Sequence, residues 1–82
     1  VGIYIDREAR KTGIGSEAIR LALRYAFDKL RCEQVYAEVL ASNEASQQML
    51  RSIGFEHTAT LPRWHWQDNH YEDLHYYQIW HP

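Results

Sequence analysis

The stretch Arg10-Lys11-Thr12-Gly13-Ile14-Gly15 decides how the chain is interpreted, because a β-rich run precedes it and a long amphipathic segment follows it. A strand, a glycine-rich turn and a helix in this order can hold phosphate groups. The glycines let the backbone approach an anion closely, and the first N–H groups of the helix lack partners inside it. The side chains of Arg10 and Lys11 add full positive charges. We therefore interpret the hexapeptide as a grip for the pyrophosphate of a nucleotide-bearing cofactor.

The same six residues also fit an ordinary strand-to-helix turn, because a Gly-x-Gly pair alone is a weak signal. The spacing does exclude two better-known phosphate motifs. The dinucleotide-binding pattern needs a third glycine, and the P-loop ends in Gly-Lys-Ser or Gly-Lys-Thr, which this stretch does not contain.

Length and composition indicate one small globular domain. The chain has 82 residues, of which 45% are hydrophobic and 13% aromatic, and this aromatic content argues against a disordered chain. The net charge of -2 and the lack of a basic block predict no nucleic-acid partner. Cys32 has no intrachain partner, and no apolar run reaches membrane-spanning length, so we expect a cytoplasmic protein without a membrane anchor. The start at Val1, directly in a strand-like run, predicts a fragment, a processed product or a truncated open reading frame.

Hydrophobic periodicity predicts six elements in the order β-α-β-α-β-β, an α/β (α+β) fold with the first two strands parallel. Ser42 or Asn43 is expected to cap the second helix, and Gly54 to end it. Pro62 inside the fifth element predicts an edge position or a bulge. Basic residues are expected at the end of the first helix. The expected strands cover residues 1–5, 34–40, 55–66 and 71–80, the last two forming an antiparallel hairpin, and the helices cover residues 16–30 and 44–53.

With these elements placed, the chain resembles the C-terminal half of a GNAT N-acetyltransferase from its first residue to its last, as a single partial domain over residues 1–82. The terminal hairpin is similar to that of the phosphinothricin and amino-acid acetyltransferases, and also to the ribosomal-protein-type and spermidine enzymes. Four stretches carry the resemblance: Arg10-x-x-Gly13-x-Gly15, Ala41-Ser42-Asn43-Glu44-Ala45-Ser46, Ile53-Gly54-Phe55, and Leu61-Pro62-Arg63 through Tyr71-x-Asp73.

The resemblance implies that acetyl-CoA is the cosubstrate and that it enters where the two parallel strands splay apart. Its pantetheine arm would pair with the free edge of the first strand, as an added strand does, and a backbone N–H there could bind the thioester oxygen. Asn43 resembles the family asparagine near the pantetheine, and a plain helix cap is the alternative. The residues implied in cofactor binding are Ile3, Tyr4, Ile5, Arg10, Lys11, Thr12, Gly13, Ile14, Gly15, Ser16 and Asn43.

The implied reaction is direct attack of a neutral amine on acetyl-CoA, which needs a base for the amine and a donor for the leaving thiolate. Glu38 resembles the proposed base of the ribosomal-protein type, and a solvent-facing strand glutamate is the alternative. The usual donor is a tyrosine seven residues after the asparagine, where this chain has Leu50. Tyr36, Ser46 or water could take its place.

The five histidines show no metal-ligand spacing, so no metal site is expected. The aromatic residues of the last two strands are interpreted mainly as core and cross-strand packing, with a role in an acceptor pocket or dimer surface left open. The acceptor cannot be named beyond a small amine, an amino acid or a protein N-terminus. An exposed edge on the first strand predicts a homodimer. A truncated, non-catalytic CoA-binding or oligomerising module remains the alternative to an enzyme.

Overall fold

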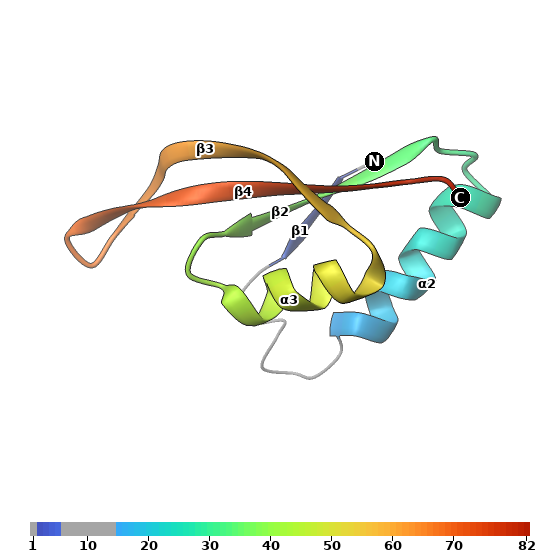
Figure 1. Ribbon diagram of the computed structural model, residues 1–82, viewed down its shortest axis with the longest axis horizontal. Helices are drawn as coiled ribbons and strands as arrows, with labels where there is room; N and C mark the ends of the chain where they lie inside the picture. The colour runs from blue at the N-terminus through green and yellow to red at the C-terminus, as the bar shows by residue number, and fades with distance from the viewer. Residues whose placement is uncertain (1, 6–14) are drawn as a thin grey trace.

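A four-stranded sheet with two helices packed on one of its faces makes up the chain in a computed structural model, which describes the backbone of residues 2–5 and all of residues 15–82 (Figure 1). The expected order of elements and the mixed α/β (α+β) class are both confirmed. The elements are β1 (Gly2–Ile5), α2 (Gly15–Asp28), β2 (Gln34–Leu40), α3 (Glu44–Ile53), β3 (Glu56–Gln67) and β4 (His70–Trp80).

The strand order β1-β2-β4-β3 places the last strand in the middle of the sheet. β1 pairs with β2 in parallel over all four of its residues, from Gly2 opposite Tyr36 to Ile5 opposite Val39. β4 runs antiparallel to both β2 and β3. The expected parallel pair and the terminal hairpin are therefore confirmed, while the expected splay beyond Ile5 lies outside the described residues.

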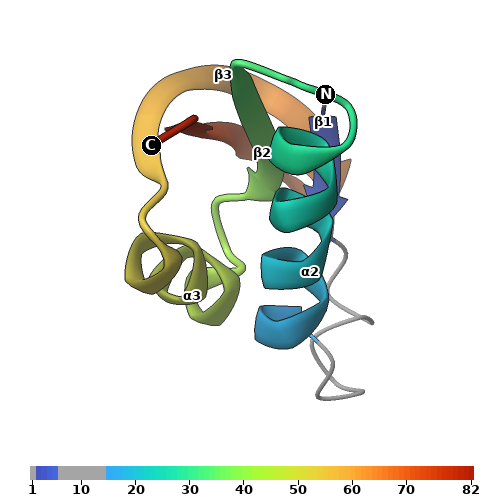
Figure 2. The ribbon, with the colours of Figure 1, turned by 90° about the vertical axis from the view of Figure 1, so that its right-hand side faces the viewer.

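The core lies between the sheet and the two helices (Figure 2). Alternate residues of β2 point to this side, and the same face of β4 contributes Tyr77, which is completely buried. Burying one large aliphatic or aromatic side chain stabilises a fold by about 1.5–3 kcal/mol. The core cluster consists of Ile19, Leu23, Ala26, Val35, Ala37, Val39, Leu50, Phe55 and Tyr77.

Helix α2 ends at Asp28, two residues before the expected end. The N–H groups of Lys29 and Leu30 both donate to the carbonyl of Tyr25, so the regular ladder stops there. Arg31 then takes a positive φ of 57°. The expectation of basic residues in the last turn is wrong, because the helix ends before both of these basic side chains.

Helix α3 has the expected bounds and caps. The side chain of Asn43, not that of Ser42, accepts the capping hydrogen bond from the N–H of Ser46. Gly54 ends the helix with a φ of 122°, and its N–H donates to the carbonyls of Leu50 and Arg51. Neither helix of the described residues is long and apolar enough to cross a membrane.

The β3–β4 hairpin extends past the helices, at the left of Figure 1. β3 is an edge strand, and its pairing shifts between Leu61 and His65, so both expectations drawn from Pro62 are confirmed. Trp66 and Tyr71 pack across the strands with ring centroids 4.8 Å apart. The expectation of core and cross-strand packing for the aromatic residues of β3 and β4 is confirmed for the buried Tyr77 and for this pair. No described element covers the far part of the hairpin, so its aromatic rings stay largely exposed. Trp64, Trp66 and Tyr71 are 58%, 57% and 56% exposed.

Candidate functional site

The backbone of β1, where the pantetheine arm is expected to pair, lies at one edge of the sheet. Ile3, Tyr4 and Ile5 are in register with Ala37, Glu38 and Val39 of β2. Among the described strands, β1 has no partner on its other side. Its geometry therefore leaves room for an added strand, as the cofactor prediction requires, and the contact itself stays a prediction.

The predicted phosphate grip is described only at its end. Arg10, Lys11, Thr12, Gly13 and Ile14 lie outside the described residues, whereas Gly15 and Ser16 form the first turn of α2. Ser16 is exposed. The helix begins at Gly15, the last residue of the hexapeptide and one residue before the expected start, and its use for phosphate remains a prediction.

Gly15 also has a packing role that the sequence did not indicate. A Cβ atom at this position would lie 2.9 Å from Sδ of Met49 in α3. This separation is too short for a carbon and a sulfur atom, so a side chain here would force Met49 to move. Gly15 therefore allows the start of α2 to pack closely against α3.

Asn43 stands at the junction of β2 and α3 and is only 2% exposed. Its Oδ1 accepts from the N–H of Ser46 at 3.4 Å, and its N–H donates to the carbonyl of Leu40 at 3.0 Å. The capping role is thus confirmed, and the predicted contact with the cofactor stays a prediction.

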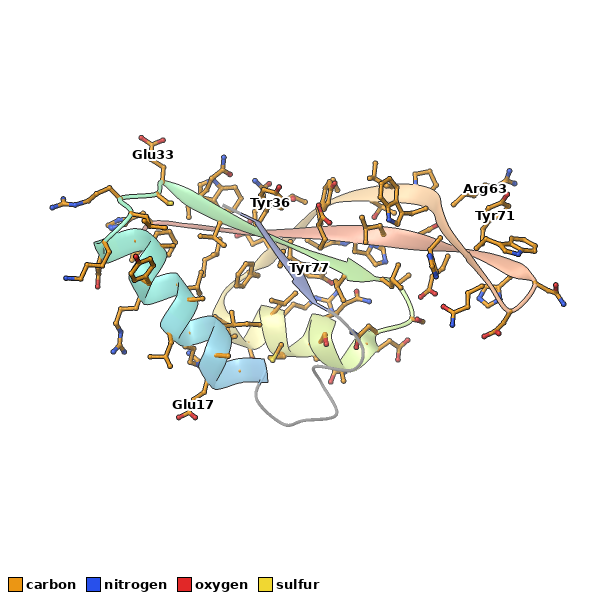
Figure 3. All side chains as sticks on the ribbon, turned by 180° about the vertical axis from the view of Figure 1, so that it is seen from behind. Glu17, Glu33, Tyr36, Arg63, Tyr71 and Tyr77 are labelled. Carbon is orange, nitrogen blue, oxygen red and sulfur yellow. The ribbon has the colours of Figure 1, made fainter. Side chains whose placement is uncertain are left out.

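The candidate proton donors separate onto opposite sides of the sheet. Leu50 is completely buried in the core, and its side chain has no acidic proton to donate. Ser46 is also on the helix side and 1% exposed, and its Oγ has no hydrogen-bond partner among the described residues. Tyr36, by contrast, lies on the face turned away from both helices, as Figure 3 shows.

Glu38 lies on this open face with two tyrosines. It alternates with the buried residues of β2, as Tyr36 does, and it is half-buried. Tyr76 of β4 is in register directly opposite Glu38, and the rings of Tyr36 and Tyr76 make an edge-to-face contact with centroids 5.9 Å apart. A hollow of about 380 Å³ opens on the same face and is lined by Tyr36, Thr58, Ala59, Tyr76 and Gln78.

Tyr76 is the candidate donor that the sequence reasoning missed. Partial burial, followed by the charge of the Glu38 carboxylate and a hydrogen bond to it, raises the pKa of Tyr76 above its ordinary value of 10.0. The phenol therefore keeps its proton at neutral pH, while the adjacent carboxylate can accept one. The sequence could not identify this pair, because it did not indicate that β4 lies between β2 and β3.

Within the part of the chain that the structure describes, no three side chains of His, Cys, Asp and Glu come together as a metal-binding group. Cys32 is a half-buried free thiol. On the open face, Glu38 and Tyr76 offer acid and base chemistry through a carboxylate and a phenol.

Comparison with known proteins gives a consistent result. The model of the GNAT acetyltransferase domain matches residues 1–56. Over 55 residues the chain is 34% identical to "Probable N-acetyltransferase YjcK" of Bacillus subtilis strain 168, covering 67% of this chain and 30% of that protein. Over 79 residues it is 30% identical to "Uncharacterized N-acetyltransferase YoaA" of the same strain, covering 96% and 45%.

A solved structure described as a probable acetyltransferase superposes with a TM-score of 0.76 at 28% identity. The superposition covers 93% of this chain and 43% of the other. The chain thus spans less than half the length of the two Bacillus relatives and of this structure.

Proposed function

The chain belongs to the GNAT acetyltransferase family, and from this premise we propose that it transfers the acetyl group of acetyl-CoA to a primary amine by direct attack. The observation that carries the proposal is the position of Glu38. It is in register with Tyr4 of the edge strand on one side and with Tyr76 on the other. The proposed base, the proposed proton donor and the expected cofactor edge would thus lie on adjacent strands.

Acetyl-CoA suits the residues around β1 and α2. The unpaired side of β1 among the described strands can receive the pantetheine backbone. Helix α2 begins at Gly15, the last residue of the glycine-rich stretch, as a phosphate site requires. When bound, the cosubstrate supplies a thioester that the amine nitrogen attacks. The residues that would hold it are Ile3, Tyr4, Ile5, Arg10, Lys11, Thr12, Gly13, Ile14, Gly15, Ser16 and Asn43.

The reaction needs two proton transfers, one for Glu38 and one for Tyr76. Glu38 accepts a proton from the attacking amine, because a positioned glutamate side chain can act as a general base. Tyr76 holds the proton for the leaving sulfur, the role for which Leu50 has no suitable atom. This assignment favours Tyr76 over Tyr36 because Tyr76 stands directly opposite Glu38, and over Ser46 because Ser46 lies on the helix side.

We also propose that the molecule acts as a homodimer through the edge of β1, and that it works in the cytoplasm, where Cys32 stays reduced. A strand with an unpaired side can pair with a second copy of itself. The dimer would compete with the pantetheine for the same backbone groups if both used the same residues of β1. We therefore expect acetyl-CoA to change the dimerisation constant.

Titration calorimetry with acetyl-CoA tests the proposal, with plain CoA and dephospho-CoA for comparison. We expect saturable micromolar binding, weaker for dephospho-CoA. A screen of small amines, amino acids and peptide N-termini for release of free thiol then identifies the acceptor. Binding without thiol release from any amine would favour the non-catalytic module, and a folded chain that binds no CoA at all would overturn the proposal.

A further inference from the structure

A second cluster of chemically active side chains lies on the hairpin and includes none of the residues assigned to the acetyltransferase site. Nε2 of His57 lies 2.9 Å from Oγ1 of Thr60 and 3.0 Å from Nδ1 of His75. Oγ1 of Thr60 lies 2.9 Å from Nδ1 of His75. The three atoms thus form a nearly equilateral triangle. The carbonyl of Ala59 adds an oxygen 3.1 Å from Nε2 of His57.

An irregularity in β3 brings these side chains together. Thr60 is directly opposite His75, and His57 is opposite Tyr77, with a shift in pairing between His57 and Ala59. In a regular strand, residues three apart point to opposite faces. The shift inserts one extra residue, so His57 and Thr60 share a face. A bulge of this kind changes the direction in which a side chain points. Here it directs the side chain of His57 to the face that carries Thr60 and His75.

Neighbouring rings hold the two imidazoles in place. The ring of His57 stacks on Tyr77 with centroids 5.1 Å apart and planes inclined by 25°. It stands nearly perpendicular to the ring of His75, with centroids 4.5 Å apart. Tyr77 is itself fixed by a hydrogen bond to Gln47. The nitrogen atoms are therefore positioned by packing before any ligand arrives.

The triangle has the dimensions of one face of a metal coordination shell. Two ligand atoms about 2.05 Å from a metal and at right angles to each other lie about 2.9 Å apart. Neutral imidazole suits nickel and copper ions, and these ions accept right-angle ligand arrangements. We propose that His57 Nε2, His75 Nδ1 and Thr60 Oγ1 form a binding site for a divalent transition metal of the Ni²⁺ and Cu²⁺ class.

The environment of His75 favours an uncharged imidazole and leaves this side chain accessible from solvent. Burial, the neighbouring His57 and the charge of Arg51 lower the pKa of His75, and Asp73 acts in the opposite direction. His75 is therefore neutral at pH 7, the form that binds metals. A groove of about 450 Å³ gives access to His75 and is lined by Ala41, Glu44, Gln47, Gln48, Arg51 and His75.

Titration calorimetry of the full chain with NiCl₂ at pH 7.5 tests the site, with MgCl₂ as the comparison because magnesium prefers oxygen ligands. We expect one saturable nickel site in the micromolar range and no heat from magnesium. His57→Ala and His75→Ala should each weaken nickel binding at least tenfold. Thr60→Val removes the hydroxyl with little change of shape and should weaken binding severalfold.

His65→Ala and His70→Ala are the matched controls, since both histidines are exposed on the same hairpin. Equal loss of affinity in these variants, or no saturable binding by the unaltered chain, would overturn the proposal. If an alanine variant fails to fold, nitrogen-15 spectra of the imidazoles with Zn²⁺ decide the question. They should show coordination at Nε2 of His57 and Nδ1 of His75, and coordination at other nitrogens would also overturn it.

Discussion

The hydroxyl of Tyr77 donates a 2.7 Å hydrogen bond to Oε1 of Gln47 and so joins the central strand β4 to helix α3. Gln47 in turn donates from Nε2 to the carbonyl of Ala41 at 2.8 Å. Ala41 begins the turn that leads to Asn43, the cap of α3. A buried side-chain pair therefore helps to hold the turn between β2 and α3, together with the hydrogen bond from the N–H of Ala41 to the carbonyl of Asp73. The same turn positions Asn43, a predicted cofactor residue.

Replacing Tyr77 with Phe should lower the free energy of unfolding by about 1–3 kcal/mol, because Oε1 of Gln47 would be buried without a donor. Urea unfolding measures the change. Tyr71→Phe is the matched control, since Tyr71 is 56% exposed. Equal stability of the two variants would show that the Tyr77 hydrogen bond contributes nothing.

Gly15→Val separates the packing role of this residue from its predicted phosphate role. The new side chain should displace the flexible end of Met49 and lower the free energy of unfolding only modestly, because methionine adapts to a changed space, and it should also abolish CoA binding. In a Met49→Ala background this displacement disappears, so the loss of stability on adding Gly15→Val should shrink. CoA binding should remain absent in the double variant, and its return would show that Gly15 acts only through packing.

The sequence predicted the elements and the parallel pair because periodicity, caps and turn residues are local signals. The predicted end of α2 is two residues too late. The N–H groups of Lys29 and Leu30 both donate to the carbonyl of Tyr25, and the pattern of apolar residues does not indicate this. The sequence also could not separate the hairpin aromatic residues that are buried, such as Tyr77, from those that stay exposed, such as Trp64. Alternation along a strand indicates a face, but only the tertiary arrangement determines whether anything covers that face.

The candidate site was predictable only in part for the same reason. Glu38 and Asn43 could be named because they stand in or beside motifs. Tyr76 became a candidate only when β4 was found between β2 and β3, since this order brings it opposite Glu38. The metal site depends on a bulge between His57 and Ala59, and no residue type in that stretch marks its position.

Glu38→Gln should lower the rate of amine acetylation by about 10²–10⁴-fold, as expected for loss of a general base, and leave CoA binding unchanged. Tyr76→Phe should reduce the rate without changing affinity for the cofactor. Steady-state assays of thiol release measure both effects once an acceptor is known. Glu33→Gln, at an exposed position just before β2, is the control. A Glu38→Gln variant as active as the Glu33→Gln variant would remove Glu38 from the mechanism.

Sedimentation over a range of protein concentrations should show a homodimer held by β1. Successive residues of a strand direct their N–H groups to opposite sides, so proline at Ile3 and at Tyr4 gives a matched pair. One of the two substitutions removes an N–H from the ladder with β2, and the other removes an N–H from the outer edge of β1. Only the substitution that removes the outer N–H should separate the dimer and leave the fold intact. A monomer at every concentration would contradict the dimer proposal.

Stability should depend on pH through His75. Its pKa in the folded chain is lowered from the ordinary value of 6.5, by burial first and then by the charges of His57 and Arg51, with Asp73 opposing them. The unfolded chain therefore binds a proton more readily at this residue, and protonation favours unfolding. The contribution of neutral His75 to the free energy of unfolding is fully present above pH 6.5 and is lost as the pH falls through the folded pKa.

Unfolding by urea at several pH values should show that the free energy of unfolding declines toward acid pH, and His75→Gln should make this decline shallower. His81→Gln, at an exposed position, should leave the slope unchanged. An identical slope in the His75→Gln variant would mean that other groups cause the decline.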